Sequence, residues 1–98
     1  MKIKHWQGYD SVEAKKLKAT NNKALGTKTV VIEVRGNHEW GLERYDMYDV
    51  HRWLRRFFKD CESFADIKEM RVCGKYEKTS NGDFIEVCEY IIEYTPAA

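Results

Sequence analysis

The most regular pattern in this chain is the segment Asp46–Lys59, with the sequence DMYDVHRWLRRFFK. Its apolar residues recur at three- and four-residue spacing, and on a helical wheel they fill one arc of about 140°. An arc of this width is typical of a helix face that packs on a core, and its members are Met47, Val50, Trp53, Leu54, Phe57 and Phe58. Asp46 is placed to cap the first turn, and Asp49 lies where the helix dipole favours a negative charge. The sequence therefore predicts one amphipathic helix at residues 46–59.

The opposite face of this helix is basic. We call it the basic helix face, and it consists of Tyr48, Arg52, Arg55, Arg56 and Lys59. Cations near a helix C-terminus complement the helix dipole, so a solvated face without a ligand is one interpretation. The alternatives are that it binds an acidic protein surface or, as the less favoured case, the phosphates of a nucleic acid. Five lysines near the N-terminus would extend this surface if their strands lie beside the helix: Lys2, Lys4, Lys15, Lys16 and Lys18.

Extended segments flank the helix on both sides. Alternation of apolar and polar residues is clearest at residues 27–35, and the ranges 2–6, 11–19, 67–78 and 84–95 are also predicted to be strands. A chain of 98 residues without a linker or a repeat has room for a single hydrophobic core. We therefore expect one α+β domain over residues 1–98, with an antiparallel β-sheet of about four strands in ββαββ-type order and one amphipathic helix packed on one face.

The last two predicted strands are joined by residues 80–83, Ser-Asn-Gly-Asp. An Asn-Gly pair favours a two-residue hairpin loop, because both central positions need a positive φ. That register would place Cys73 and Cys88 diagonally, too far apart for an easy disulfide. It would also set Glu77 opposite Glu86, which is a repulsive pair. A bulge or a longer loop would relieve this repulsion, so the sequence does not decide how the residues of the two strands are paired.

Both faces of this sheet are expected to be apolar. The helix would cover Val30, Ile32 and Val34 together with Met70, Val72, Tyr76, Ile85, Val87 and Ile91. The other face would carry Phe84, Cys88, Tyr90, Ile92 and Tyr94, which is too apolar for a face left in water. Either another part of the chain covers that face, such as residues 1–10, or a second copy or a partner does. We take Phe84, Tyr90, Ile92 and Tyr94 as candidate dimer or partner contacts.

Composition and spacing argue against several classes of site. Seventeen Lys and Arg residues balance sixteen Asp and Glu residues, so no global field attracts nucleic acid or an anionic membrane. The three cysteines, Cys61, Cys73 and Cys88, show no C-x-x-C or Cys/His spacing, and we expect no metal and no cofactor.

The longest aliphatic run, residues 30–32, is far too short for a membrane span, and the N-terminus lacks the apolar core of a signal peptide. We expect a cytoplasmic protein with reduced thiols.

The loop at residues 36–45 holds the remaining candidates. Trp40 and Tyr45 lie among charged residues, a composition typical of protein interfaces, although the same aromatics would also serve to cap the core. His38 and Glu39 form the one pair with the composition of an acid–base site, and no nucleophile signature lies near them.

These features favour a small non-enzymatic protein-interaction or regulatory module, with a homodimer as one form of it. Its candidate partner-binding residues are Trp40, Tyr45, Tyr48, Arg52, Arg55, Arg56 and Lys59. The alternative is a weak nucleic-acid-binding protein that uses the basic helix face, and the third hypothesis is a small hydrolase around His38. Compact chains without enzyme motifs are common among accessory proteins of phages and mobile elements, which supports that origin by association only.

Overall fold

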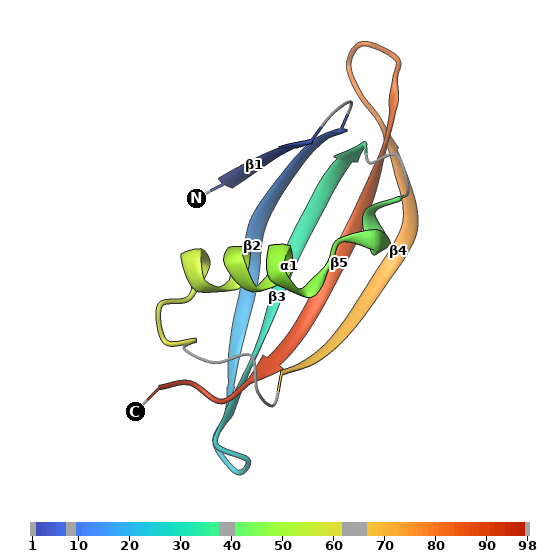
Figure 1. Cartoon of the computed structure of the whole chain (residues 1–98). Helices are drawn as coiled ribbons and strands as arrows, with labels where there is room; N and C mark the ends of the chain where they lie inside the picture. Colours follow the sequence, from blue (N-terminus) through green and yellow to red (C-terminus); the bar gives the residue numbers. More distant parts are fainter. Residues whose placement is uncertain (1, 8–9, 38–40, 62–66, 98) are drawn as a thin grey trace.

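A five-stranded antiparallel sheet with one helix across it forms the fold (Figure 1). The computed structural model describes the backbone of residues 2–7, 10–37, 41–61 and 67–97, and their side chains from Val12 onward. The elements in chain order are β1 (Lys2–Gln7), β2 (Asp10–Asn22), β3 (Thr27–Asn37), the 3-10 turn η1 (Leu42–Arg44), α1 (Met47–Phe57), β4 (Lys68–Lys78) and β5 (Phe84–Tyr94). The predicted α+β domain with one helix on an antiparallel sheet is confirmed, and β1 adds a further strand at one edge.

The strand order is β1-β2-β3-β5-β4. The last strand, β5, therefore pairs with β3, and β4 lies at the edge of the sheet. Strands β1, β2 and β3 pair as consecutive hairpins. The chain then passes over one face through η1 and α1 to the far edge, where β4 lies, and β5 returns between β3 and β4. The crossing segment covers the central strands, and the molecule measures 45 × 22 × 22 Å along its principal axes.

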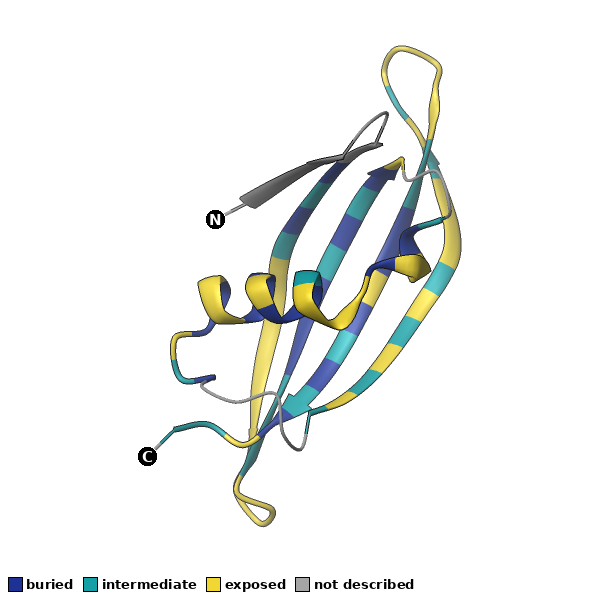
Figure 2. Ribbon diagram, in the orientation of Figure 1, coloured by how far each residue is buried: buried dark blue, intermediate teal, exposed yellow. Residues whose placement is uncertain are grey.

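Helix α1 begins and packs as its sequence pattern predicts. The carboxylate of Asp46 accepts a hydrogen bond from the backbone N–H of Asp49 at 2.9 Å, which satisfies a donor that the first turn leaves without an intrahelical partner. The inward residues of α1 are buried against the sheet, as the dark stripe along the helix in Figure 2 shows: Val50, His51, Trp53, Leu54 and Phe57. Met47, predicted for the same stripe, is instead exposed at the start of the helix.

The register between β3 and β5 decides which residues lie beneath α1. It pairs three residues of each strand: Val30 with Ile92, Ile32 with Tyr90, and Val34 with Cys88. Residues directly opposite in an antiparallel pair share a face, and all six are fully buried in the helix-covered core. The prediction that Tyr90, Ile92 and Tyr94 lie on the face away from the helix is therefore wrong. A register change of one residue moves every side chain of a strand to the other face, and sequence alternation alone does not define that choice.

The face away from α1, which we call the open face, carries the residues assigned by sequence to the helix side. They are Met70, Val72, Ile85, Val87 and Ile91, together with Val31 of β3. Met70 is 58% exposed and Val72 52% exposed, and within the described ranges no helix or strand covers them. Tyr76, also assigned to the core, is exposed near the far end of β4. Met70, Val72, Ile85, Val87 and Ile91 lie on the open face because β5 presents its even-numbered residues to α1, whereas Tyr76, opposite Glu86, is exposed beyond the bulge.

The β4–β5 hairpin closes with a longer loop than the two-residue loop predicted. The backbone N–H of Thr79 donates to the carbonyl of Asp83 at 2.7 Å, and that of Gly82 donates to the carbonyl of Thr79 at 3.0 Å. Gly82 has φ +87°, as the last residue of a three-residue hairpin loop requires. Glu77 consequently lies opposite Ile85 rather than Glu86, so the repulsive pair does not form.

A β-bulge lies further along the same hairpin. Lys75 is opposite Val87 but Val72 is opposite Glu89, so Cys73 and Gly74 together face Cys88. Gly74 has φ +96°, a conformation that L side chains rarely adopt, which explains why a glycine stands at this position. The bulge carries Cys73 to the helix side of the sheet and directly beside Cys88.

Candidate functional site

Four residues of the basic helix face lie on the outside of α1, while Lys59 follows the end of the helix, which is two residues earlier than predicted. Tyr48 is 74% exposed, and Arg52, Arg55, Arg56 and Lys59 are all exposed. Arg52 lies 3.8 Å from the carboxylate of Asp49 one turn earlier, an exposed pair that contributes little to stability. In the part of the chain that the structure describes, Arg55, Arg56 and Lys59 form no ion pair. Their charges are therefore available to a ligand.

His51 lies on the inner side of the same helix and adds no charge to this surface at neutral pH. Burial lowers the pKa of its imidazole below the ordinary value, and the positive charge of Arg55 lowers it further. The buried histidine therefore stays neutral, and the positive charge of the helix comes from its arginines.

The basic surface continues from the end of α1 onto the neighbouring strands. The ammonium groups of Lys16 in β2 and Lys28 in β3 lie 5.6 Å and 5.1 Å from the centre of the Phe58 ring. Lys28 also pairs with Asp60 at 3.2 Å, so its charge is neutralised. Lys16 is exposed and lies on the helix side, next to the end of the basic helix face. Lys15, also expected to extend that surface, instead pairs with Glu33 on the opposite face of the sheet.

Asp60 joins the end of the helix to the sheet through a small polar cluster. Burial opposes its ionisation, but the hydrogen bond from the Tyr94 hydroxyl at 2.6 Å and the charge of Lys28 together lower the pKa of Asp60 below its ordinary value. Burial and the same hydrogen bond raise the pKa of Tyr94. The cluster fixes the chain that leaves α1, and with it the direction of the basic stripe.

Tyr45, a candidate partner contact in the loop at residues 36–45, lies in the core and not at the surface. Tyr45 is only 4% exposed, and its ring meets that of Trp53 edge to face with centroids 5.0 Å apart. It is part of the core, so its assignment as an exposed partner contact is corrected. Trp40, His38 and Glu39 lie outside the described residues.

The candidate dimer contacts also change. Tyr90, Ile92 and Tyr94 are fully buried beneath α1, where no second molecule reaches them while the domain is folded. Phe84 alone of the four remains accessible, 65% exposed at the start of β5. The physical reason is the register of β5 against β3, which turns the even-numbered residues towards the helix.

The open face is edged by an alternating row of charges. Glu33 lies 3.6 Å from Lys15 and 3.3 Å from Arg35, and Arg35 contacts Glu77 at 2.5 Å. Burial works against the charged form of Arg35, but its hydrogen bonds to Glu77 and Glu33 raise its pKa above the ordinary value. Val31 and Val87, which lie on the same face, are each only 5% exposed.

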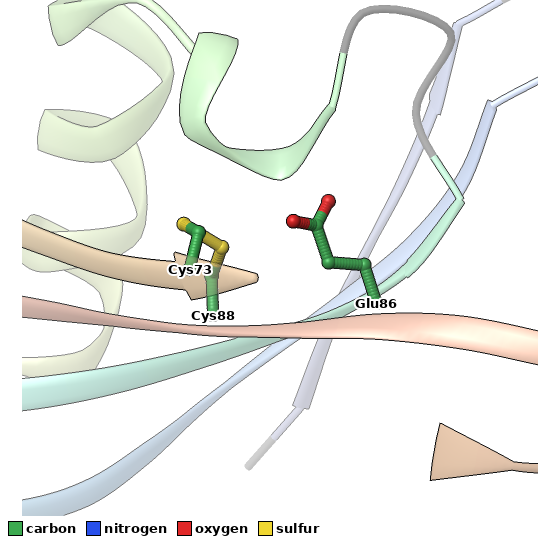
Figure 3. Close-up of side chains that lie close together, drawn as sticks. All are labelled: Cys73, Glu86 and Cys88. Carbon is green, nitrogen blue, oxygen red and sulfur yellow. A yellow bond between two sulfur atoms is a disulfide. The ribbon is translucent and has the colours of Figure 1, made fainter. Parts of the chain in front are cut away.

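A second cluster, formed by Cys73, Glu86 and Cys88, lies at the bulge (Figure 3). The two cysteines are joined as a disulfide, with Cα atoms 4.4 Å apart, so the prediction that they are too distant to pair is wrong. Glu86 points to the same side of the sheet, and its carboxylate accepts the backbone N–H of Leu42 in η1 at 2.8 Å. One ligand atom from each residue lies within 4.8 Å of the other two.

This cluster was missed because its members have no diagnostic spacing. Cys73 and Cys88 are fifteen residues apart and are brought together by the bulge. One sequence signal was present, since an isolated glycine within a strand pattern indicates a bulge, and Gly74 directly follows Cys73.

Two further contacts hold η1 above β4 and β5, next to the cluster. The Tyr90 hydroxyl donates to the carbonyl of Leu42, and the guanidinium of Arg71 donates to the carbonyl of Glu43 at 2.6 Å. That guanidinium also lies 4.5 Å from the centre of the Tyr90 ring. The segment above the cysteines is thus fixed by side chains of both neighbouring strands.

None of the described helices is long and apolar enough to cross a membrane. No protein-family model matches this chain, and no significantly similar curated protein or solved structure is found for it. The surfaces described above are therefore the basis on which a function is assigned.

Proposed function

We propose that this chain is a non-enzymatic interaction module that binds an acidic protein surface through the basic helix face. The observation that carries the proposal is the sorting of charge on α1. Its inner face is buried in the core, while its outer face presents three exposed arginines and an exposed tyrosine, and the exposed Lys59 follows directly after the helix. Arg55, Arg56 and Lys59 have no ion-pair partner among the described residues, so binding carboxylates would not break an existing contact.

The composition of the stripe favours a protein over a nucleic acid. Arginine binds carboxylates with two parallel hydrogen bonds, and tyrosine and arginine are both enriched where binding energy concentrates in protein interfaces. Tyr48 and the neighbouring Met47 supply apolar contact area at one end. From Tyr48 to Arg56 the stripe is about 12 Å long at 1.5 Å per residue, which suits a compact acidic patch.

The Cys73–Cys88 disulfide contradicts the expectation that all thiols are reduced. The cytoplasm stays the compartment proposed for this module, because one disulfide among three cysteines is not a disulfide framework. The hydrolase hypothesis gains no support, since His38 lies outside the described residues. Dimerisation through Tyr90, Ile92 and Tyr94 is withdrawn because those side chains are in the core.

The test is a fluorescence anisotropy titration with three labelled probes at about 50 and 200 mM salt. The probes are a glutamate-rich peptide with interspersed aromatics and mixed-sequence single- and double-stranded oligonucleotides. We expect the peptide to bind most tightly and to lose only part of its affinity at the higher salt. Stronger oligonucleotide binding that collapses at the higher salt would replace the proposal with nucleic-acid binding, because counterion release gives that steep dependence.

A matched pair of variants distinguishes the basic helix face from net charge. Arg52→Glu/Arg56→Glu should weaken peptide binding by about tenfold or more, because it reverses two adjacent charges of the stripe. Lys23→Glu/Lys78→Glu changes the net charge equally at exposed lysines away from α1, and should alter the affinity by about twofold or less. Equal losses in both variants, or no peptide binding by the unaltered chain, would contradict the proposal.

A further inference from the structure

The cluster at the bulge has the composition of a metal site rather than of a structural bridge alone. Cys73 and Cys88 provide two sulfurs, and Glu86 provides a carboxylate, with all three ligand atoms within 4.8 Å of one another. They come from β4 and β5, two adjacent hydrogen-bonded strands, so the backbone holds them at fixed separation. The Glu86 carboxylate lies beside the two sulfurs on the same side of the sheet, as Figure 3 shows.

The carboxylate of Glu86 is oriented by a partner outside the cluster. Its Oε1 accepts the Leu42 N–H at 2.8 Å, and η1 is itself held by Tyr90 and Arg71. Hydrogen bonds of this kind fix metal-ligating groups in position and tune their affinity. With Oε1 engaged by the backbone, Oε2 is the atom assigned to the metal.

We propose that, once the disulfide is reduced, Cys73, Cys88 and Glu86 bind one zinc ion. Zinc takes thiolate sulfur and carboxylate oxygen readily, and three protein ligands leave its fourth tetrahedral position to water or to an exchangeable ligand. Cys88 is fully buried whereas Cys73 and Glu86 are half-buried, so the ion enters from the side of the latter two. The zinc site is independent of the function proposed for the basic helix face.

The chemistry balances with a phosphine reductant. The phosphine breaks the Cys73–Cys88 bond and is oxidised to its oxide, taking oxygen from water, while two water protons complete the two thiols. Zinc binding then releases both thiol protons to solvent and forms two Zn–S bonds. In a cell a low-molecular-weight thiol would serve as the reductant and leave as its own disulfide.

The test compares the oxidised and reduced protein after incubation with zinc, removal of free metal by gel filtration, and elemental analysis. We expect about one zinc per chain in the reduced protein and almost none in the oxidised protein, because the disulfide removes two ligands. Cobalt substituted for zinc should give a thiolate-to-cobalt charge-transfer band in the reduced protein. Failure of the reduced protein to retain zinc or to give that band would overturn the proposal.

Three variants locate the site. Cys73→Ser should abolish zinc retention, and Glu86→Gln, which leaves both cysteines in place, should weaken zinc affinity by about tenfold or more. Cys61→Ser is the matched control, because Cys61 is a buried cysteine that lies outside the cluster. Zinc lost equally in Cys61→Ser, or unchanged in Glu86→Gln, would overturn the assignment. Glu86→Gln keeps the test decisive if Cys73→Ser fails to fold, and circular dichroism reports folding of each variant.

Discussion

The two faces of this sheet are built from the same strands, yet different physical effects stabilise them. On the covered face, side chains of β3 and β5 pack against α1 and are fully removed from water. On the open face, Val31 and Val87 are nearly as buried, although no described helix covers them, and a row of paired charges lies on the same face: Lys15, Glu33, Arg35 and Glu77. Low exposure of a residue therefore does not by itself identify the core. The difference also explains how one helix suffices for a domain of this size.

The largest effect is expected where the helix and the sheet meet. Trp53 is fully buried, and its ring contacts those of Tyr45 and Tyr90. Trp53→Ala should lower the free energy of unfolding by about 3–5 kcal/mol, because it removes a large buried aromatic and leaves a cavity. In a chain with the usual margin of stability this approaches complete unfolding. Urea denaturation followed by circular dichroism measures it, and a loss below about 1 kcal/mol would show that α1 is not firmly packed.

A paired comparison tests the difference between the faces directly. Ile92 is fully buried under α1, whereas Met70 on the open face is more than half exposed. Ile92→Ala should cost about 2–5 kcal/mol, and Met70→Ala less than about 1 kcal/mol. The two side chains are similar in size, so volume alone predicts equal losses. Equal destabilisation in urea titrations would mean that an additional layer covers the open face in solution.

The hydroxyl of Tyr94 makes the free energy of unfolding depend on pH in the alkaline range. Burial and the bond to Asp60 raise the pKa of Tyr94, so above about pH 10 the unfolded chain loses this proton while the folded chain retains it. The contribution of Tyr94 is therefore complete below about pH 10 and declines above it by up to about 1.4 kcal/mol per pH unit.

The control for this prediction is Tyr94→Phe, which removes the Tyr94 hydroxyl but keeps that of Tyr90, whose pKa burial also raises. Urea denaturation of both proteins at about pH 8, 10 and 11 should show a steeper decline for the unaltered chain. Absorbance near 295 nm should show at least one of the six tyrosines remaining protonated until the protein unfolds. Full ionisation of all six in a folded protein would contradict the proposed environment of Tyr94.

The smallest effect is expected at the start of the covering helix. Asp46→Ala removes the acceptor for the Asp49 N–H and should cost about 1 kcal/mol. Asp46→Asn retains a side-chain oxygen at the same position and should cost less. The two variants are compared by their urea midpoints, and the prediction fails if the alanine variant is as stable as the asparagine variant.

Helix α1 could be predicted in detail because its signals are local. The periodicity of Val50, Trp53, Leu54 and Phe57 and the cap at Asp46 depend on neighbours three or four residues away. The basic helix face was derived from the same wheel, and its residues are exposed as predicted. Its role in binding stays a prediction.

The strands were located nearly as well, but their faces were not. The odd-numbered and the even-numbered residues of β5 are both largely apolar. Hydrophobicity alone therefore does not indicate which of the two sets faces the helix. Lys75 and Val72 belong to different registers with β5 because one bulge separates them. Local sequence does not reveal that shift, which brings Cys73 opposite Cys88, nor the pairing of β5 with β3, which decides the face of Tyr90 and Ile92.

The sequence by itself determines the set of elements, since one amphipathic helix and several extended segments are properties of short windows. The tertiary structure alone decided that Tyr90, Ile92 and Tyr94 enter the core and that Cys73 meets Cys88 and Glu86. These outcomes depend on strand register, a property of paired segments far apart in the chain. Because side chains alternate with a period of two, a single bulged position changes which residues meet.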